Sequence, residues 1–82
     1  MTINLSKQAA KDFRKLEQQL QQRTKNLLAQ LDDDPALGKP RKGPLAGLWS
    51  IRLANTYRVI YEPAGDTGFI VAITRRRDAY KP

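Results

Sequence analysis

The sequence predicts an α+β fold, in which an N-terminal helical hairpin packs on one face of a small antiparallel sheet in the order strand, helix, helix, strand, strand, strand. Two patterns support this prediction. Apolar residues recur at helical spacing between residues 10 and 31, and three runs rich in β-branched and aromatic residues follow between residues 49 and 74. The chain has 82 residues, so we expect one domain over residues 1–82 with a small core.

The N-terminal part is predicted to form a short strand followed by helix. Residues 2–5 alternate polar and apolar side chains, which favours a brief leading strand, and Ser6 is a suitable N-cap. The apolar face of the helical region is formed by Ala10, Phe13, Leu16, Leu20, Leu27, Leu28 and Leu31. This spacing indicates two helices or one bent helix. We expect the helix to end at residues 32–34, because three aspartates are unfavourable at its negative end and Pro35 follows them.

The second half is predicted to form a loop and three strands. Residues 36–47 are rich in glycine and proline, which indicates a loop. It is a basic loop, because it carries Lys39, Arg41 and Lys42. The predicted strands are residues 49–53, 57–62 and 69–74. Short links between them favour consecutive antiparallel neighbours.

Alternation along the strands predicts which residues share a face of the sheet. The apolar sets expected to face the helices are Trp49, Ile51 and Leu53 in one strand and Phe69, Val71 and Ile73 in the last strand. The opposite, open face then receives Ser50, Arg52, Arg58, Ile60, Ile70, Ala72 and Thr74. This alternation predicts an exposed surface on which arginines are mixed with Ile60 and Ile70.

The amino-acid composition restricts the chemistry that this chain can perform. The chain contains no cysteine and no histidine, which excludes disulfides, an imidazole base and the usual zinc sites, so we expect no metal and no cofactor. The net charge is +7, and nine of the 15 basic residues follow Pro35, which indicates an anionic partner such as nucleic acid. No run of apolar residues is long enough to span a membrane, and the N-terminus lacks a signal pattern. We therefore expect a cytoplasmic protein without membrane contact.

Three segments resemble the RelE/ParE superfamily of toxins from type II toxin–antitoxin systems. They are the run Pro44-Leu45-Ala46-Gly47-Leu48-Trp49-Ser50-Ile51-Arg52-Leu53, the strand Tyr57-Arg58-Val59-Ile60-Tyr61 and the ending Ala72-Ile73-Thr74-Arg75-Arg76-Arg77-Asp78-Ala79-Tyr80. The resemblance covers nearly the whole chain, including the helical opening at residues 6–13. It implies a RelE-like fold, a cognate antitoxin as partner and, for RelE-like members, cleavage of messenger RNA in the ribosomal decoding site.

The resemblance also implies roles for individual residues. Carried over position by position, the nuclease residues are Arg52, Arg58, Arg76 and Tyr80. This chain departs from the pattern at Ser50, where the nuclease members have a lysine. Residues expected to contact RNA or the ribosome are Lys39, Arg41, Lys42, Arg75, Arg77, Lys11, Arg14 and Lys15. Ile60 and Ile70 are expected to contact the antitoxin.

The residue chemistry suits attack of a ribose 2′-hydroxyl on the adjacent phosphate. Arginine grips phosphate oxygens with a planar fork of donors, but it is a poor base. Removal of the 2′-hydroxyl proton is therefore left to Tyr80, water, Lys39, Lys42 or the ribosome. A nuclease built in this way should be slow on free RNA, which agrees with dependence on a ribosome that orients the substrate.

Other interpretations of the same residues remain open. A ParE-like inhibitor of DNA gyrase without nuclease activity is favoured by the departure at Ser50, and a simple nucleic-acid-binding module is compatible with the charge. Arg75–Arg77 can be a solvated run, Arg58 can pair with Glu62 or Asp78, and Tyr80 can be a packing residue. Trp49 is expected in the core, because it shares the alternation of Ile51 and Leu53.

Overall fold

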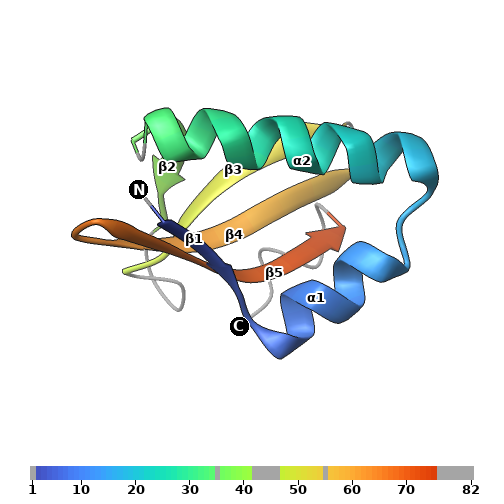
Figure 1. The fold of residues 1–82 in the computed structure, drawn as a ribbon, viewed down its shortest axis with the longest axis horizontal. Helices are drawn as coiled ribbons and strands as arrows, with labels where there is room; N and C mark the ends of the chain where they lie inside the picture. Colours follow the sequence, from blue (N-terminus) through green and yellow to red (C-terminus); the bar gives the residue numbers. More distant parts are fainter. Residues whose placement is uncertain (1, 35, 42–46, 55, 76–82) are drawn as a thin grey trace.

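The computed structural model describes residues 2–34, 36–41, 47–54 and 56–75, and it confirms the α+β class (Figure 1). The elements in chain order are β1 (Thr2–Leu5), α1 (Lys7–Arg14), α2 (Gln18–Asp33), β2 (Lys39–Pro40), β3 (Trp49–Ala54), β4 (Tyr57–Ala64) and β5 (Thr67–Arg75). The five strands form one sheet in the order β1-β5-β4-β3-β2. None of the helices in these ranges is long and apolar enough to cross a bilayer.

Two features of the sheet differ from the prediction. The three C-terminal strands are antiparallel neighbours as expected, but β1 lies parallel to β5, so the sheet is mixed. The predicted basic loop contains the short edge strand β2, in which Lys39 pairs with Ser50 and Pro40 with Trp49. A strand of two residues carries too little alternation to be detected in a segment rich in glycine and proline.

The helical region forms two helices, which is one of the two predicted arrangements. Ser6 caps α1 as expected, because its Oγ accepts a hydrogen bond from the Ala9 amide at 2.9 Å. The chain turns between the helices, where the Leu16 amide donates to the Phe13 carbonyl and the Gln21 side chain donates to the same oxygen. At the other end α2 stops at Asp33, within the predicted run of aspartates.

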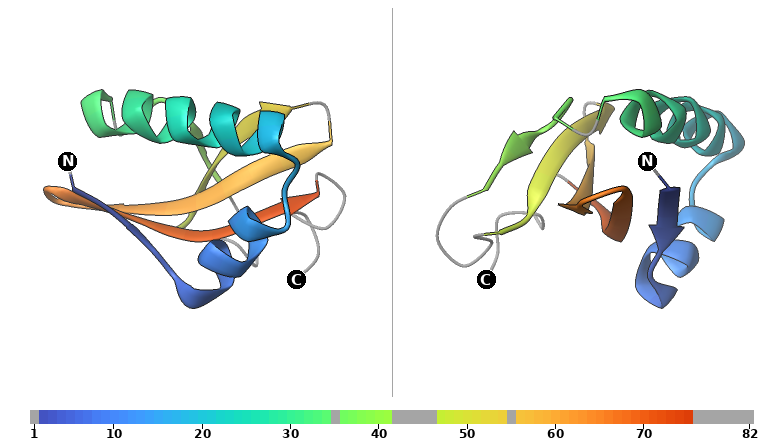
Figure 2. Two further views of the ribbon diagram at one scale, coloured as in Figure 1. Left: turned by 45° about the vertical axis from the view of Figure 1, so that its right-hand side comes forward. Right: turned by 60° about the vertical axis from the view of Figure 1, so that its left-hand side comes forward.

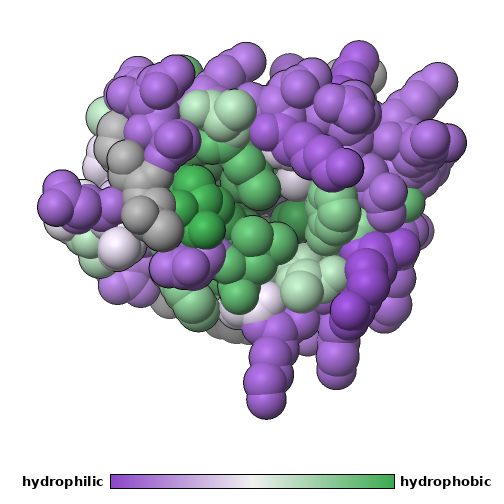
Figure 3. All heavy atoms as spheres, in the orientation of Figure 1, coloured by the Kyte–Doolittle hydropathy of each residue, from purple (hydrophilic) through white to green (hydrophobic). Residues whose placement is uncertain are grey.

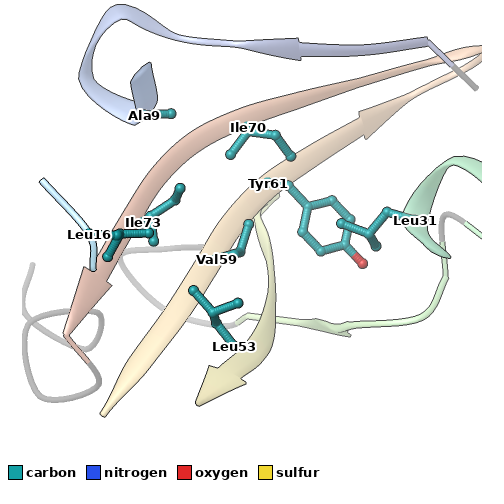
Figure 4. Packing of buried hydrophobic residues seen from close by; sticks show 8 residues of the cluster. All are labelled: Ala9, Leu16, Leu31, Leu53, Val59, Tyr61, Ile70 and Ile73. Atoms are coloured by element: carbon teal, nitrogen blue, oxygen red, sulfur yellow. The ribbon is translucent and has the colours of Figure 1, made fainter. Parts of the chain in front are cut away.

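The hydrophobic core lies between the helices and one face of the sheet. Figure 2 shows α2 lying across that face of the twisted sheet, with α1 beside the β1–β5 end. The buried cluster drawn in Figure 4 comprises Ala9, Leu16, Leu31, Leu53, Val59, Tyr61, Ile70 and Ile73. Trp49 and Ile51 are partly buried against this cluster, so their predicted orientation toward the helices is confirmed.

A β-bulge in β5 overturns part of the predicted alternation. Ile60 pairs with Ala72 and Tyr61 with Ile70, so Val71 is an extra residue on β5. The bulge brings both Ile70 and Ile73 to the helix side, three residues apart. The prediction for Ile73 is therefore correct, whereas Ile70 is fully buried in the core rather than on the open face, and Phe69 is 44% exposed rather than buried.

The outer edge of β5 is covered by α1 beyond the point where β1 ends. The register of β1 stops at the pair Leu5–Ile70. From there the Ser6 Oγ donates to the Val71 carbonyl at 2.7 Å, and Asp12 Oδ2 accepts from the Ile73 amide at 3.0 Å. These bonds satisfy backbone groups that an uncovered strand edge would leave open.

Candidate active site

A hollow of about 410 Å³ lies at the β2–β3 end of the sheet, on the face opposite the core. Its lining residues are Leu37, Gly38, Lys39, Arg41, Ser50, Ile51, Arg52 and Arg58. Four of these are basic, and none of the described lining residues is acidic. A concave site of this kind attracts an anion, because the field of several cations adds within a recess that partly excludes water.

The register of three strands brings the polar side chains of the hollow onto one face. Lys39 pairs with Ser50 across β2 and β3, and Arg52 pairs with Arg58 across β3 and β4. Directly paired residues point to the same side of a sheet, so all four side chains project away from the helices. The sequence prediction that Ser50, Arg52 and Arg58 share the open face is confirmed.

Burial differs sharply within this group. Arg52 and Lys39 are exposed and Arg58 is half-buried, whereas Ser50 is only 3% exposed. Among the described residues the Ser50 Oγ has no hydrogen-bond partner. A buried hydroxyl without a partner costs free energy, so its presence at the floor of a basic hollow marks a place where a polar ligand atom can bind.

The segment that carries Lys39 and Arg41 is tied to the core by Tyr61. The Tyr61 hydroxyl accepts a hydrogen bond from the Gly38 amide at 2.9 Å, and its ring lies 6.3 Å from that of Trp49. Burial raises the pKa of Tyr61 above its ordinary value, and the charge of Asp34 acts in the same direction, while the bond from Gly38 opposes both. The side chain is therefore neutral at physiological pH and remains available as a hydrogen-bond partner.

Gly38 is required by space at this contact. A Cβ atom at this position would lie 2.6 Å from both the Ser50 carbonyl oxygen and the Tyr61 hydroxyl oxygen. Only glycine lets the segment approach β3 and β4 this closely. The sequence showed Gly38 as a turn residue, but not its contact with Tyr61, because the two lie far apart in the chain.

The predicted RNA-contacting and nuclease residues divide into four groups. Lys39 and Arg41 line the hollow with Arg52 and Arg58. Lys15 and Arg75 line a separate hollow of about 450 Å³ beside Tyr57, whereas Lys11 and Arg14 are exposed on α1. The predicted residues that lie outside the described part of the chain are Lys42, Arg76, Arg77 and Tyr80.

The exposed apolar surface is not where the sequence placed it. Ile60 faces the open side by its pairing with Ser50, but it is only 5% exposed, and Ile70 is fully buried on the other side. The mixed surface of arginines and isoleucines is therefore a wrong prediction. Figure 3 shows apolar side chains gathered instead on the helix side, in the middle of the face between α2 and α1. The partly buried Ile3 of β1, Phe13 of α1 and Leu27 of α2 pack around the core.

Comparison with families and sequences supplies an independent line of evidence. Residues 3–80 match the family model of the ParE toxin of the type II toxin–antitoxin system parDE. The chain is also 42% identical over 53 residues to Toxin YoeB from Streptomyces coelicolor. That match covers 60% of this chain and 63% of the relative, which is less than two thirds of its length.

Two solved structures with the same fold are complexes of a toxin with its antitoxin. The RelBE2 toxin–antitoxin complex from Mycobacterium tuberculosis contains a chain with a TM-score of 0.82 and 28% identity, covering 92% of this chain and 96% of that one. The YoeB–YefM complex from Staphylococcus aureus gives a TM-score of 0.79 at 22% identity, covering 90% and 94%. At this lower identity the similarity concerns the fold alone.

Proposed function

Because the chain belongs to the ParE toxin family of type II toxin–antitoxin systems, we propose that it acts as a ribosome-dependent messenger RNA endonuclease that inhibits translation in the cytoplasm. The observation that carries this proposal is the basic hollow with the buried Ser50 hydroxyl at its floor. The similarity to Toxin YoeB and to the RelBE2 chain supports a toxin of the RelE and YoeB type.

The hollow is suited to hold the phosphate at which the RNA is cut. Arg52 and Arg58 are directly opposite each other on β3 and β4, so their guanidinium groups can bind different oxygens of one phosphate. Attack by the 2′-hydroxyl concentrates negative charge on those oxygens, and cations already in place stabilise it without reorganising. Metal is not needed for this part of the reaction.

Two further residues, Arg76 and Tyr80, are part of the proposal because of the resemblance to the RelE/ParE superfamily. Arg76 is expected to add a third guanidinium after β5, and Tyr80 to transfer a proton or to stack on a base. Arg75 ends β5, whose outer edge is secured by the bond from Ile73 to Asp12.

Dependence on the ribosome follows from what the hollow lacks. None of its described lining residues is a carboxylate, and the chain has no histidine, so the described part of the hollow holds no efficient general base. A ribosome that holds the message in a reactive geometry can supply much of the rate enhancement through orientation. The basic residues outside the hollow, Lys11, Arg14, Lys15, Lys42, Arg75 and Arg77, are proposed to contact RNA or the ribosome.

A cognate antitoxin is the proposed protein partner. Two of the similar solved structures are toxin–antitoxin complexes, and a chain with net charge +7 favours an acidic partner. Ile60 and Ile70 cannot be its exposed anchors, because both are buried. An antitoxin that shields the basic hollow would block RNA directly.

The test is cell-free translation of a defined message with purified protein, followed by primer extension to locate new ends with and without ribosomes. We expect cuts in the decoding site only when ribosomes are present. Arg52→Ala should slow cleavage by about a hundredfold, since one charge-stabilising group is lost. Lys25→Ala is the matched control, because it removes one exposed charge from α2 outside the hollow.

Two outcomes would contradict the proposal. One is an intact message with ribosomes present, and the other is an Arg52→Ala variant as active as Lys25→Ala. Intact message together with inhibited DNA supercoiling by gyrase would support the ParE-like alternative instead. The matching family model is that of the ParE toxin, which is the reason to test this alternative. The similar toxins named above are of the RelE and YoeB type.

A further inference from the structure

Lys39 occupies a special position among the cations of the hollow. It lies on β2 and pairs directly with Ser50 on β3, so its side chain is on the same face of the sheet as the buried hydroxyl. Two residues further along β3, Arg52 pairs with Arg58 on β4, and this pair lies on the same face. The pairing of β2 with β3 therefore places Lys39 in the hollow, which its position in the sequence does not indicate.

The hydrogen bond between Gly38 and Tyr61 restricts the backbone directly before Lys39. Gly38 donates to the Tyr61 hydroxyl, which is itself buried in the core. On the other side Arg41 donates its amide to the Leu48 carbonyl at 2.8 Å. A residue held between two such contacts keeps its backbone position, as a group that transfers a proton must.

The chemistry distinguishes Lys39 from the other three cations. A guanidinium holds its protons too firmly to transfer one, whereas an ammonium group is a compact acid that can. Among the described residues that line the hollow, Lys39 is the only ammonium group. Cleavage of RNA requires a proton for the 5′-oxygen as it leaves, and Arg41, Arg52 and Arg58 cannot provide it.

We propose that Lys39 is the general acid of the reaction, an inference that rests on the proposed function. The 2′-oxygen forms a bond to phosphorus, and its proton passes to solvent water. The bond between phosphorus and the 5′-oxygen breaks, and the ammonium group of Lys39 gives its proton to that oxygen. The products are a 2′,3′-cyclic phosphate and a 5′-hydroxyl, and Lys39 regains its proton from solvent.

The first test uses a ribosome-bound message with a single sulfur in place of the bridging 5′-oxygen at the cleavage site. A thiolate leaves without protonation, so loss of a general acid matters little for this substrate. Lys39→Ala should slow cleavage of the ordinary message by about a hundredfold and that of the sulfur-substituted message by less than about threefold. Lys39→Arg, which keeps the charge, should remain slow on the ordinary message.

A second test moves the lysine across the strand pair. In the double variant Lys39→Ala with Ser50→Lys, an ammonium group returns to the hollow from β3, and we expect cleavage to recover by about tenfold or more over Lys39→Ala alone. Lys25→Ala again serves as the control. Circular dichroism of each variant checks that the sheet is retained.

The outcomes separate this inference from the proposed function. If the parent protein cuts the message but Lys39→Ala is equally slow on both substrates, Lys39 is not the acid and only the inference is overturned. Full activity of Lys39→Arg would also overturn it, because charge alone would then suffice. If the parent protein leaves ribosome-bound message intact, the proposed function is overturned, and the inference with it.

Discussion

The two faces of the sheet in this small protein have opposite properties. On the helix side, residues such as Leu53, Val59 and Ile70 are buried in an apolar cluster. On the other side, the same strands present Ser50, Arg52 and Arg58 to a basic hollow. Because side chains alternate along a strand, residues that are neighbours in the sequence lie on opposite faces of the sheet and have different roles. Stability is therefore concentrated on one side of the sheet and positive charge on the other, and β3 and β4 contribute to both sides.

Tyr61 connects the two sides. Its ring lies in the core, but its hydroxyl reaches the Gly38 amide in the segment that carries Lys39. Changes in the core can therefore affect the hollow through one hydrogen bond. Four substitutions test how far the two faces are separate, and they follow in order of expected effect on the free energy of unfolding.

Ile70→Ala should lower the free energy of unfolding by about 2–4 kcal/mol, because it leaves a cavity in the core. Its neighbour Phe69 is 44% exposed, so Phe69→Ala should cost less than about 1 kcal/mol. Urea denaturation of both variants measures the difference. A larger loss in the free energy of unfolding for Phe69→Ala than for Ile70→Ala would show that β5 lacks the bulge and follows simple alternation.

Gly38→Ala should lower the free energy of unfolding by about 1–3 kcal/mol, since the new methyl group would overlap the Ser50 carbonyl and the Tyr61 hydroxyl. Gly65→Ala is not a suitable control, because Gly65 has a positive φ of 59°, at which an alanine would be strained. The appropriate comparison is the double variant Gly38→Ala with Tyr61→Phe. If the overlap with the hydroxyl matters, the two changes will not be additive.

Tyr61→Phe should lower the free energy of unfolding by about 1 kcal/mol at neutral pH, because the Gly38 amide loses its acceptor. Burial raises the pKa of Tyr61 above 10.0, so the unfolded chain loses this proton first as the pH rises. The stability linked to the neutral hydroxyl is complete below about pH 10 and is lost as the pH rises through the folded pKa. Urea denaturation on both sides of pH 10 should show a smaller alkaline loss for the variant than for the parent protein.

Arg52→Gln should have the smallest effect on stability and the opposite sign. Arg52 lies directly across from Arg58, and like charges in that position destabilise a sheet. We expect the free energy of unfolding to rise by about 0.2–1 kcal/mol at low salt, while RNA cleavage falls. Added salt should reduce the gain, since it screens exposed charges. A destabilised Arg52→Gln variant would mean that the basic face also supports the fold.

The sequence indicated most of the architecture and part of the site. Helical spacing predicted the helices, Ser6 predicted the cap, and the alternation of Ser50 to Leu53 predicted the two faces of β3. Arg52 and Arg58 were placed together on the open face from the residues alone. These features depend on neighbours within a few positions, which is why local patterns were sufficient.

Other features depended on contacts between distant segments. The bulge at Val71 reverses the alternation of β5, and it is visible only in the register of β5 against β4. The parallel pairing of β1 with β5 joins segments more than 60 positions apart. For this reason Phe69, Ile70 and the exposure of Ile60 were predicted wrongly, although the residue types were suitable for a strand.

Composition and short-range periodicity account for the excess of positive charge, the absence of imidazole and thiol chemistry, and the chain order of both helices and of every strand except β2. The opposition of Lys39 and Ser50, the contact of Gly38 with Tyr61 and the burial of Ile70 in the core became apparent only in the three-dimensional structure. The physical reason is that strand register and close packing are set by many weak contacts between segments that are remote in the chain.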